Sequence, residues 1–337
     1  MRENELPCPY TILDYNGLLK ISLPGVLKRL RKLIVEEDFQ ILQTFFEDSI
    51  FVAWLATRFI GHDIVLLSSR RDMGLGEGNQ PWYHRVYGLL LPLINRDFDG
   101  IVANSQQVKS YVANREKAHS DKIEVIYNGV DLPNQPDPPQ IHNQSKNGEI
   151  IIAIVASLTP VKRHDVLIEA VSLIKPQLFG TRTNIKVIAL GQGPEKERLE
   201  FLTRQLQVND LFHFQGAVTN VSDYLSYVDI GVLCSDREGL SNAILEYMAS
   251  GLPVVATEVG GNIEMVSDLN GRCVPADDPD ALACALCELI LDRQKRERMG
   301  GVSRKKVLED FSWQRSLDHL ESYYLKLTSK RGMTDAG

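Results

Sequence analysis

Short apolar runs of strand length alternate with stretches of helical periodicity along most of the chain, and this alternation constrains the fold more than any other feature. A helix between two strands carries the chain back to the start of the sheet, so that consecutive strands run parallel. Strands that helices cover on both faces are apolar throughout, as these runs are. The sequence therefore predicts an α/β fold built from doubly wound parallel sheets.

The predicted strands form two groups, separated by a segment rich in Pro, Asn and Gln that has no apolar periodicity. The first group comprises residues 39–46, 63–69, 100–104 and 123–127. The second comprises residues 150–158, 184–190, 211–214, 229–235 and 253–257. At roughly 150 residues per domain, the length of 337 residues accommodates two domains.

The domain boundaries follow from these groups. We expect an N-terminal Rossmann-like domain at residues 1–135, a linker at 136–149 and a second doubly wound domain at 150–310. Residues 311–330 carry apolar side chains at helical spacing, which predicts an amphipathic helix that packs back on the N-terminal domain. Ligands of such sheets bind beside the carboxyl ends of the strands, so the site residues should follow strands and face a cleft between the domains.

Charge and cysteine content exclude several classes of protein. Lys and Arg number 37 against 44 Asp and Glu, and the net charge of −7 argues against nucleic-acid binding. The five cysteines are few and odd in number, which fits a reducing compartment and no disulfide framework. Cys284 and Cys287 lack the second pair that a zinc site needs, and we expect them in the core.

The chain shows no signal sequence and no apolar run long enough to cross a bilayer, so we expect it in the cytoplasm. Basic residues stand among leucines in the segment 20–32. This pattern is compatible with peripheral contact at the inner face of a membrane, and equally with a core-facing helix that has a basic outer face.

The most informative stretch joins a strand, a loop, a helix and a Gly-Gly loop between residues 235 and 261. Gly239 allows a close backbone approach, and Ser241 or Asn242 can cap the helix that follows. The unpaired amides of a helix N-terminus favour an anion such as a phosphate. Glu238 and Glu246 flank this turn, and carboxylates accept hydrogen bonds from sugar hydroxyls, although two solvated glutamates would have the same spacing.

Three further loops follow predicted strands of the second domain. Lys162 follows the strand 150–158 and can neutralise a diphosphate without a metal ion, whereas Arg163 is interpreted as a surface residue. Gly191 and Gly193 form a tight turn after the next strand. Ala217 follows a third strand, where backbone groups can contact a planar base or simply form a turn.

Several blocks resemble, in order, the nucleotide-binding domain of retaining GT-B glycosyltransferases of family 4. They read SLTPVKRHDVLIEA, LGQGPEKERL, FQGAV and DREGLSNAILEYMASGLPVVATEVGG. The blocks IVANSQQVKSYV, IEVIYNGVDL and FSWQRSLDHLESYY agree with the same family and extend the resemblance over most of the chain. The resemblance implies an N-terminal acceptor domain and a C-terminal domain that binds a nucleotide sugar such as a UDP- or GDP-sugar.

The resemblance also implies roles for individual residues. Glu238 would contact the donor sugar, Glu246 the ribose hydroxyls and Lys162 the diphosphate. The remaining donor-binding positions would be Ser157, Gly191, Gly193, Ala217, Gly239, Leu240, Ser241 and Asn242. The implied reaction moves a sugar, with retention of configuration and without a metal or another cofactor, to a hydroxyl of a glycan or a lipid-linked acceptor.

The chain departs from the family pattern at two places. Ser157 stands where the family often has an arginine. Residues 1–38 offer one strand candidate, at 10–15, and a helix at Leu23–Glu36, which is too little for the usual first βαβ unit. We therefore expect a shortened N-terminal domain, and a noncatalytic relative that binds a nucleotide sugar is the alternative. A sugar-nucleotide epimerase of related fold is a third interpretation.

Charged residues near the first group of strands have weaker assignments. Arg70, Arg71 and Asp72 follow a strand and can bind the acceptor, or can pair with nearby acids. Asp97 and Asp99 form the DxD pattern of metal-dependent glycosyltransferases of another fold. They precede a strand, however, and parallel sheets present their sites at the opposite end, so we interpret both as turn acids.

Overall fold

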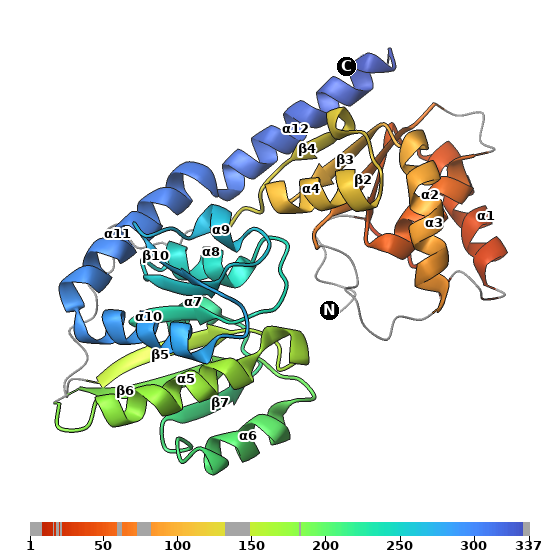
Figure 1. Ribbon diagram of the computed structural model, residues 1–337. Helices are drawn as coiled ribbons and strands as arrows, with labels where there is room; N and C mark the ends of the chain where they lie inside the picture. Colours follow the sequence, from red (N-terminus) through yellow and green to blue (C-terminus); the bar gives the residue numbers. More distant parts are fainter. Residues whose placement is uncertain are drawn as a thin grey trace.

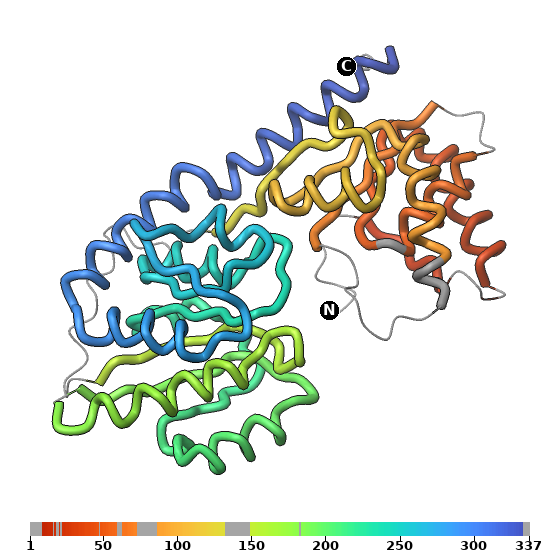
Figure 2. Tube along the Cα trace, viewed as in Figure 1, coloured from red at the N-terminus to blue at the C-terminus, as the bar shows by residue number. Residues whose placement is uncertain are grey.

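The computed structural model describes residues 9–15, 17, 20, 22–58, 63–72, 82–131, 149–181 and 183–332. Each of two domains contains one parallel sheet with helices on both faces, as expected from the alternation of strands and helices (Figure 1). A long C-terminal helix runs from the second domain to the first (Figure 2).

The N-terminal domain has a four-stranded sheet in the order β1-β2-β3-β4, with all described pairs parallel. Its elements are α1 (Leu23–Glu36), β1 (Ile41–Phe45), α2 (Glu47–Thr57), β2 (Val65–Arg70), α3 (Trp82–Asp97), β3 (Gly100–Ala103), α4 (Gln106–Arg115), the 3-10 turn η1 (Ser120–Lys122) and β4 (Ile123–Val125). Helices α2, α3 and α4 cover the face that carries Leu66 and Ile101. Val65 and Leu67 point to the opposite face, where α12 (Trp313–Lys330) packs with Tyr323 and Leu327.

The C-terminal domain has a six-stranded parallel sheet in the order β10-β9-β8-β5-β6-β7. Its elements are β5 (Glu149–Val155), η2 (Pro160–Lys162), α5 (His164–Gln177), β6 (Asn184–Leu190), α6 (Lys196–Gln205), β7 (Phe212–Gly216), α7 (Val221–Leu225), β8 (Ile230–Leu233), α8 (Asn242–Ala249), β9 (Val254–Thr257), α9 (Asn262–Met265), β10 (Gly271–Val274), α10 (Pro279–Leu291) and α11 (Arg293–Asp310). One core lies between the sheet and α5, α6 and α10, and a second lies between the sheet and α7 and α8.

All the strands of both predicted groups form where the sequence predicts them. Two predictions are wrong. Residues 10–15 form no strand, and β5 already begins at Glu149, inside the predicted linker 136–149, whose other residues lie outside the described part. The sequence pattern did not predict strand β10, because the segment GRCV contains an arginine among small and apolar residues and is only partly buried.

Helix α12 is tied to the N-terminal domain at several points. The hydroxyl of Tyr323 donates to the carbonyl of Lys122 at 3.0 Å. Near the end of the helix, Arg331 donates to Asp99 at 2.8 Å and to Asp63 at 2.6 Å. The other oxygen of Asp99 accepts from the amide of Leu66 at 2.7 Å. Asp99 therefore has a structural role, as its interpretation as a turn acid requires.

Polar groups flanking these helices also have defined partners. Asp97 accepts from Trp54 at 2.6 Å and from Arg58 at 3.1 Å. On α1, Arg31 donates to the carbonyls of Leu55 and Ala56, so part of the basic segment 20–32 caps α2.

None of the described helices combines the length and the apolar character needed to cross a bilayer.

The two cysteines of the CxxC pattern differ. Cys287 packs partly against the larger core of the C-terminal domain, whereas Cys284 is exposed. The prediction of core packing is therefore wrong for Cys284, because its position on α10 turns it to solvent. The four described cysteines are free thiols.

Candidate functional site

Loops from three neighbouring strands are joined at the carboxyl edge of the second sheet. The amide of Leu158 donates to Gln192 at 3.1 Å, and the amide of Gly191 donates to Gly216 at 2.8 Å. A Cβ at Gly191 would lie 2.0 Å from the carbonyl oxygen of Ala156, and a Cβ at Gly193 would lie 2.3 Å from that of Leu158. Both glycines are therefore needed where these loops meet.

The turn before α8 has the geometry of an anion site. The hydroxyl of Ser241 accepts from the amide of Ile244 at 3.4 Å and caps the helix. In the described part of the chain, the amides of Gly239 and Leu240 find no acceptor. These donors and the helix dipole favour a negatively charged group at the turn.

Lys162 and Glu238 meet across the carboxyl ends of the adjacent strands β5 and β8, although 76 residues separate them in sequence. Their side chains are only 23 % and 10 % exposed, and Nζ lies 2.6 Å from Oε1. The hydroxyl of Ser235 donates to the same oxygen at 2.6 Å. This arrangement fixes a cation and a carboxylate beside the turn that begins with Gly239.

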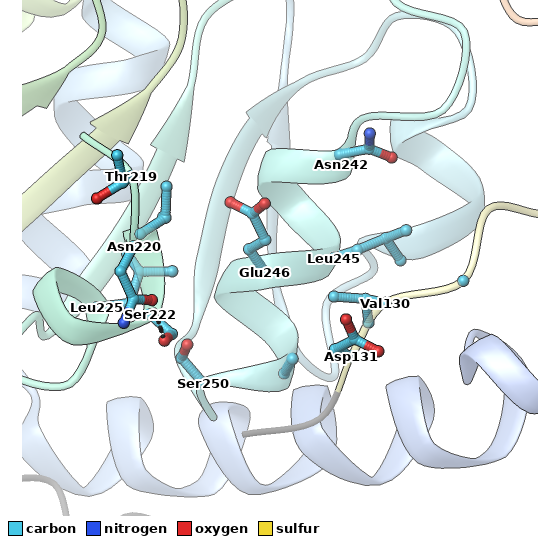
Figure 3. Close-up of a pocket in the computed structure, with 13 residues that line it drawn as sticks. Val130, Asp131, Thr219, Asn220, Ser222, Leu225, Asn242, Leu245, Glu246 and Ser250 are labelled. Carbon is cyan, nitrogen blue, oxygen red and sulfur yellow. Dashed lines mark hydrogen bonds between the residues drawn. The ribbon is translucent and has the colours of Figure 1, made fainter. Parts of the chain in front are cut away.

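Glu246 lies one turn into α8 and lines a pocket of about 360 Å³ (Figure 3). Thr219, Asn220 and Leu225 face it from the loop before α7 and from α7 itself. Burial raises the pKa of Glu246 above its usual range, and its carboxylate has no hydrogen-bond donor among the described residues. A partly buried acceptor without a partner is suited to a ligand that supplies hydroxyl groups.

The other residues predicted around this edge lie in three settings. Ser157 is exposed, and its hydroxyl lies 3.3 Å from that of Thr159. Ala217 is exposed beyond the end of β7, and Leu240 is buried in the core behind the turn. Arg163 pairs with three carboxylates, those of Asp165, Asp236 and Asp277, and its side chain is only 21 % exposed, so it is more enclosed than the surface residue that the sequence indicated.

Arg70 and Arg71 follow the same strand but differ in their surroundings. The Arg70 side chain is 6 % exposed and is held by Glu116 at 3.0 Å and by Asn95 at 3.1 Å. Of the two roles that the sequence allows for Arg70, contact with an acceptor or pairing with a nearby acid, the structure shows the second. Arg71 and Asp72 are exposed at the strand end.

The turn before α8 faces the N-terminal domain. A Cβ at Gly239 would lie 2.0 Å from the carbonyl oxygen of Arg71, and Asn128 donates to Asn242 at 2.9 Å. These contacts place the predicted turn at the junction of the two domains.

A second contact between the domains could not be predicted from the sequence. Glu264, on α9, accepts from the amides of Gln106 and Gln107 at 3.1 and 3.2 Å, and from the hydroxyl of Tyr127 at 3.0 Å. Its carboxylate therefore occupies the N-terminus of α4 in the other domain. Nothing in the local sequence around Glu264 marks this role, because its partners lie about 140 to 160 residues earlier in the chain.

Comparison with known proteins assigns both halves of the chain. Residues 139–306 match the family model "Glycosyl transferases group 1", and residues 8–133 match "Glycosyltransferase Family 4". The N-acetyl-alpha-D-glucosaminyl L-malate synthase of Bacillus anthracis is 25 % identical over 280 residues, which cover 81 % of this chain and 70 % of that protein. A GDP-mannose-dependent alpha-(1-6)-phosphatidylinositol monomannoside mannosyltransferase of Mycobacterium tuberculosis is 26 % identical over 328 residues, or 90 % of this chain and 80 % of its own.

Solved structures have the same fold. A glycosyltransferase from Rickettsia africae superimposes with a TM-score of 0.76 at 21 % identity, over 93 % of this chain and 83 % of its own. Anabaena HepE in complex with UDP superimposes with a TM-score of 0.75 at 20 % identity, over 88 % of this chain and 81 % of its own.

Proposed function

Because the chain belongs to the group 1 glycosyltransferases and has their GT-B fold, we propose that it transfers a sugar from a nucleotide sugar to an acceptor hydroxyl. We further propose that the transfer retains the anomeric configuration and needs no metal ion, as the family resemblance implies. The observation that carries the proposal is the pair of Lys162 and Glu238 beside a turn whose amides have no acceptor among the described residues, with Glu246 one turn into the helix that follows.

Each group has a part in this reaction. The amides of Gly239 and Leu240 bind the diphosphate, and Lys162 neutralises the charge that develops on it as the bond to the sugar breaks. Glu238, held by Lys162 and Ser235, accepts hydrogen bonds from the donor sugar. Glu246 accepts from the two ribose hydroxyls, with the base beside the loop that carries Thr219.

The relatives define which donors and acceptors to test. HepE is crystallised with UDP, whereas the mycobacterial relative is named for GDP-mannose. The name of the Bacillus anthracis relative contains L-malate, and the name of the mycobacterial relative contains phosphatidylinositol monomannoside. We propose a UDP- or GDP-sugar as the donor and a glycan or lipid-linked hydroxyl as the acceptor, bound on the N-terminal domain.

The test compares Glu246→Ala and Glu238→Ala with Glu309→Ala, a control on the exposed side of α11. The thermal shift produced by UDP, GDP and their sugars identifies the donor, because a ligand stabilises the fold that binds it. We expect Glu246→Ala to weaken nucleotide binding about tenfold or more, because the ribose loses its acceptor. We expect Glu238→Ala to bind the nucleotide but to lose about 100-fold or more in transfer or donor hydrolysis.

Two results would count against the proposal. Full activity of both variants would refute the assignment of the site. Nucleotide binding by the wild-type protein without transfer or hydrolysis of any donor would favour the noncatalytic alternative, and release of an altered sugar without an acceptor would favour an epimerase.

A further inference from the structure

A second pocket, of about 300 Å³, lies between the carboxyl edge of the N-terminal sheet, the first residue of α8 and the start of α12. Its lining includes the apolar side chains of Phe45, Val102, Ile126, Trp313, Leu317 and Leu320. It also includes the polar side chains of Arg71, Asn104, Asn128 and Asn242. The pocket therefore offers both apolar and polar side chains to one ligand.

Arg71 supplies a positive charge that no carboxylate of the described residues pairs with, whereas Arg70 and Arg331 each bind carboxylates. Its guanidinium lies 5.2 Å from the ring of Phe45, and partial burial lowers its pKa, although the residue as a whole is exposed. An unpaired guanidinium beside an aromatic ring is suited to an anionic ligand group.

The pocket borders the proposed donor site. Asn242, its contribution from the C-terminal domain, is the first residue of α8, and the carbonyl of Arg71 lies against Gly239. A ligand held here would have its polar end beside the turn assigned to the donor diphosphate.

We propose that this pocket binds the acceptor, and that the acceptor is an anionic amphiphile. Its negative group lies at Arg71 and its apolar part lies against Trp313 and Leu317. This inference rests on the proposed glycosyl transfer and adds the chemical class of the acceptor to it. Because α12 supplies Trp313, Leu317 and Leu320 to the lining, the C-terminal helix contributes to the selection of the acceptor as well as joining the domains.

The test is calorimetric titration of the whole chain with n-octyl phosphate, inorganic phosphate and n-octyl glucoside. We expect octyl phosphate to bind about tenfold more tightly than either of the others, because only octyl phosphate has both the charge and the chain. Arg71→Ala and Leu317→Ser should each weaken its binding about tenfold, and Arg115→Ala, on an exposed position of α4, should not. Equal binding of octyl phosphate to the wild type and Arg71→Ala would overturn the inference, as would equal binding of inorganic phosphate and octyl phosphate.

The thermal shift with nucleotides separates this inference from the proposed function. Arg71→Ala should keep the wild-type nucleotide response, because the donor groups lie on the other domain. Binding of nucleotides without binding of octyl phosphate would refute the inference about the acceptor and leave the proposed function standing. Binding of octyl phosphate through Arg71 without any sugar transfer would support the pocket and refute the proposed reaction.

Discussion

Charged side chains with similar sequence contexts differ in their roles because their partners come from distant parts of the chain. Lys162 and Arg163 are adjacent, yet the first meets Glu238 beside the turn and the second is surrounded by three aspartates. Arg70 is likewise bound by Glu116, 46 residues away. The sequence could predict Lys162 from a loop that follows a strand, but it could not predict that Arg70 is sequestered, because nothing local marks Glu116.

His164 gives a prediction about pH at the scale of one residue. Burial lowers its pKa to about 4, with Asp165 opposing and Lys162 adding to the shift, and neither ring nitrogen has a partner among the described residues. In the unfolded chain this imidazole binds a proton near pH 6.5, whereas in the folded protein it stays neutral down to about pH 4. The contribution of His164 to the free energy of unfolding should therefore be constant above pH 6.5. It should decrease between pH 6.5 and 4, by up to about 3 kcal/mol.

Urea denaturation between pH 7.5 and 4.5 measures this slope. His164→Phe should be less pH-dependent than the wild type, because it removes one of the groups that take up protons on unfolding. His119→Phe changes an exposed histidine and should keep the wild-type slope. If the slopes of wild type and His164→Phe coincide, burial does not depress the pKa of this imidazole.

At the scale of secondary structure, the second domain was the more predictable one. Its site is composed of strand-turn-helix junctions such as Gly239 to Asn242, and each junction has a local signal: a glycine at a close approach, a capping serine and a strand before them. The acceptor side has no such signal. Its pocket combines strand ends with α12, which begins roughly 190 to 270 residues further along the chain, and only folding brings them together.

Gly239 tests how far the turn depends on close packing between the domains. Gly239→Ala places a methyl group against the Arg71 carbonyl, so we expect the domains to separate locally and nucleotide binding to weaken about tenfold. Gly25→Ala is the matched control, because a Cβ at Gly25, inside α1, meets no atom within 4 Å. It should stabilise the protein by up to about 1 kcal/mol. Nucleotide titration and urea denaturation of both variants check this, and unchanged nucleotide affinity in Gly239→Ala would contradict it.

At the scale of the whole molecule, the domains are joined by apolar packing, such as that of Tyr127 on Phe311, and by polar contacts that water can replace. Glu264 is central among them because it satisfies two amides of α4 and the hydroxyl of Tyr127, whose pKa is raised to about 12 by burial first and by Glu264 second. Glu264→Ala removes all three hydrogen bonds at once. We expect it to increase the radius of gyration in small-angle X-ray scattering, with Glu309→Ala unchanged.

Saturating nucleotide should reverse this increase if the donor also binds across the junction of the domains. The secondary structure measured by circular dichroism should stay the same, because Glu264 contacts the first turn of a helix and not its interior. A scattering curve of Glu264→Ala that matches the wild type would show that the remaining contacts hold the domains without this residue.

The bridge between Val130 and Ser312 has a mechanical consequence. Val130 lies near the end of the described part of the N-terminal domain and Ser312 caps the start of α12, so the chain leaves that domain and returns to it at neighbouring points. Figure 2 shows α12 running on from the second domain to the first. Because both connections hold the domains at the same place, we expect a relative movement of the domains to be a rotation about that place rather than a sliding movement.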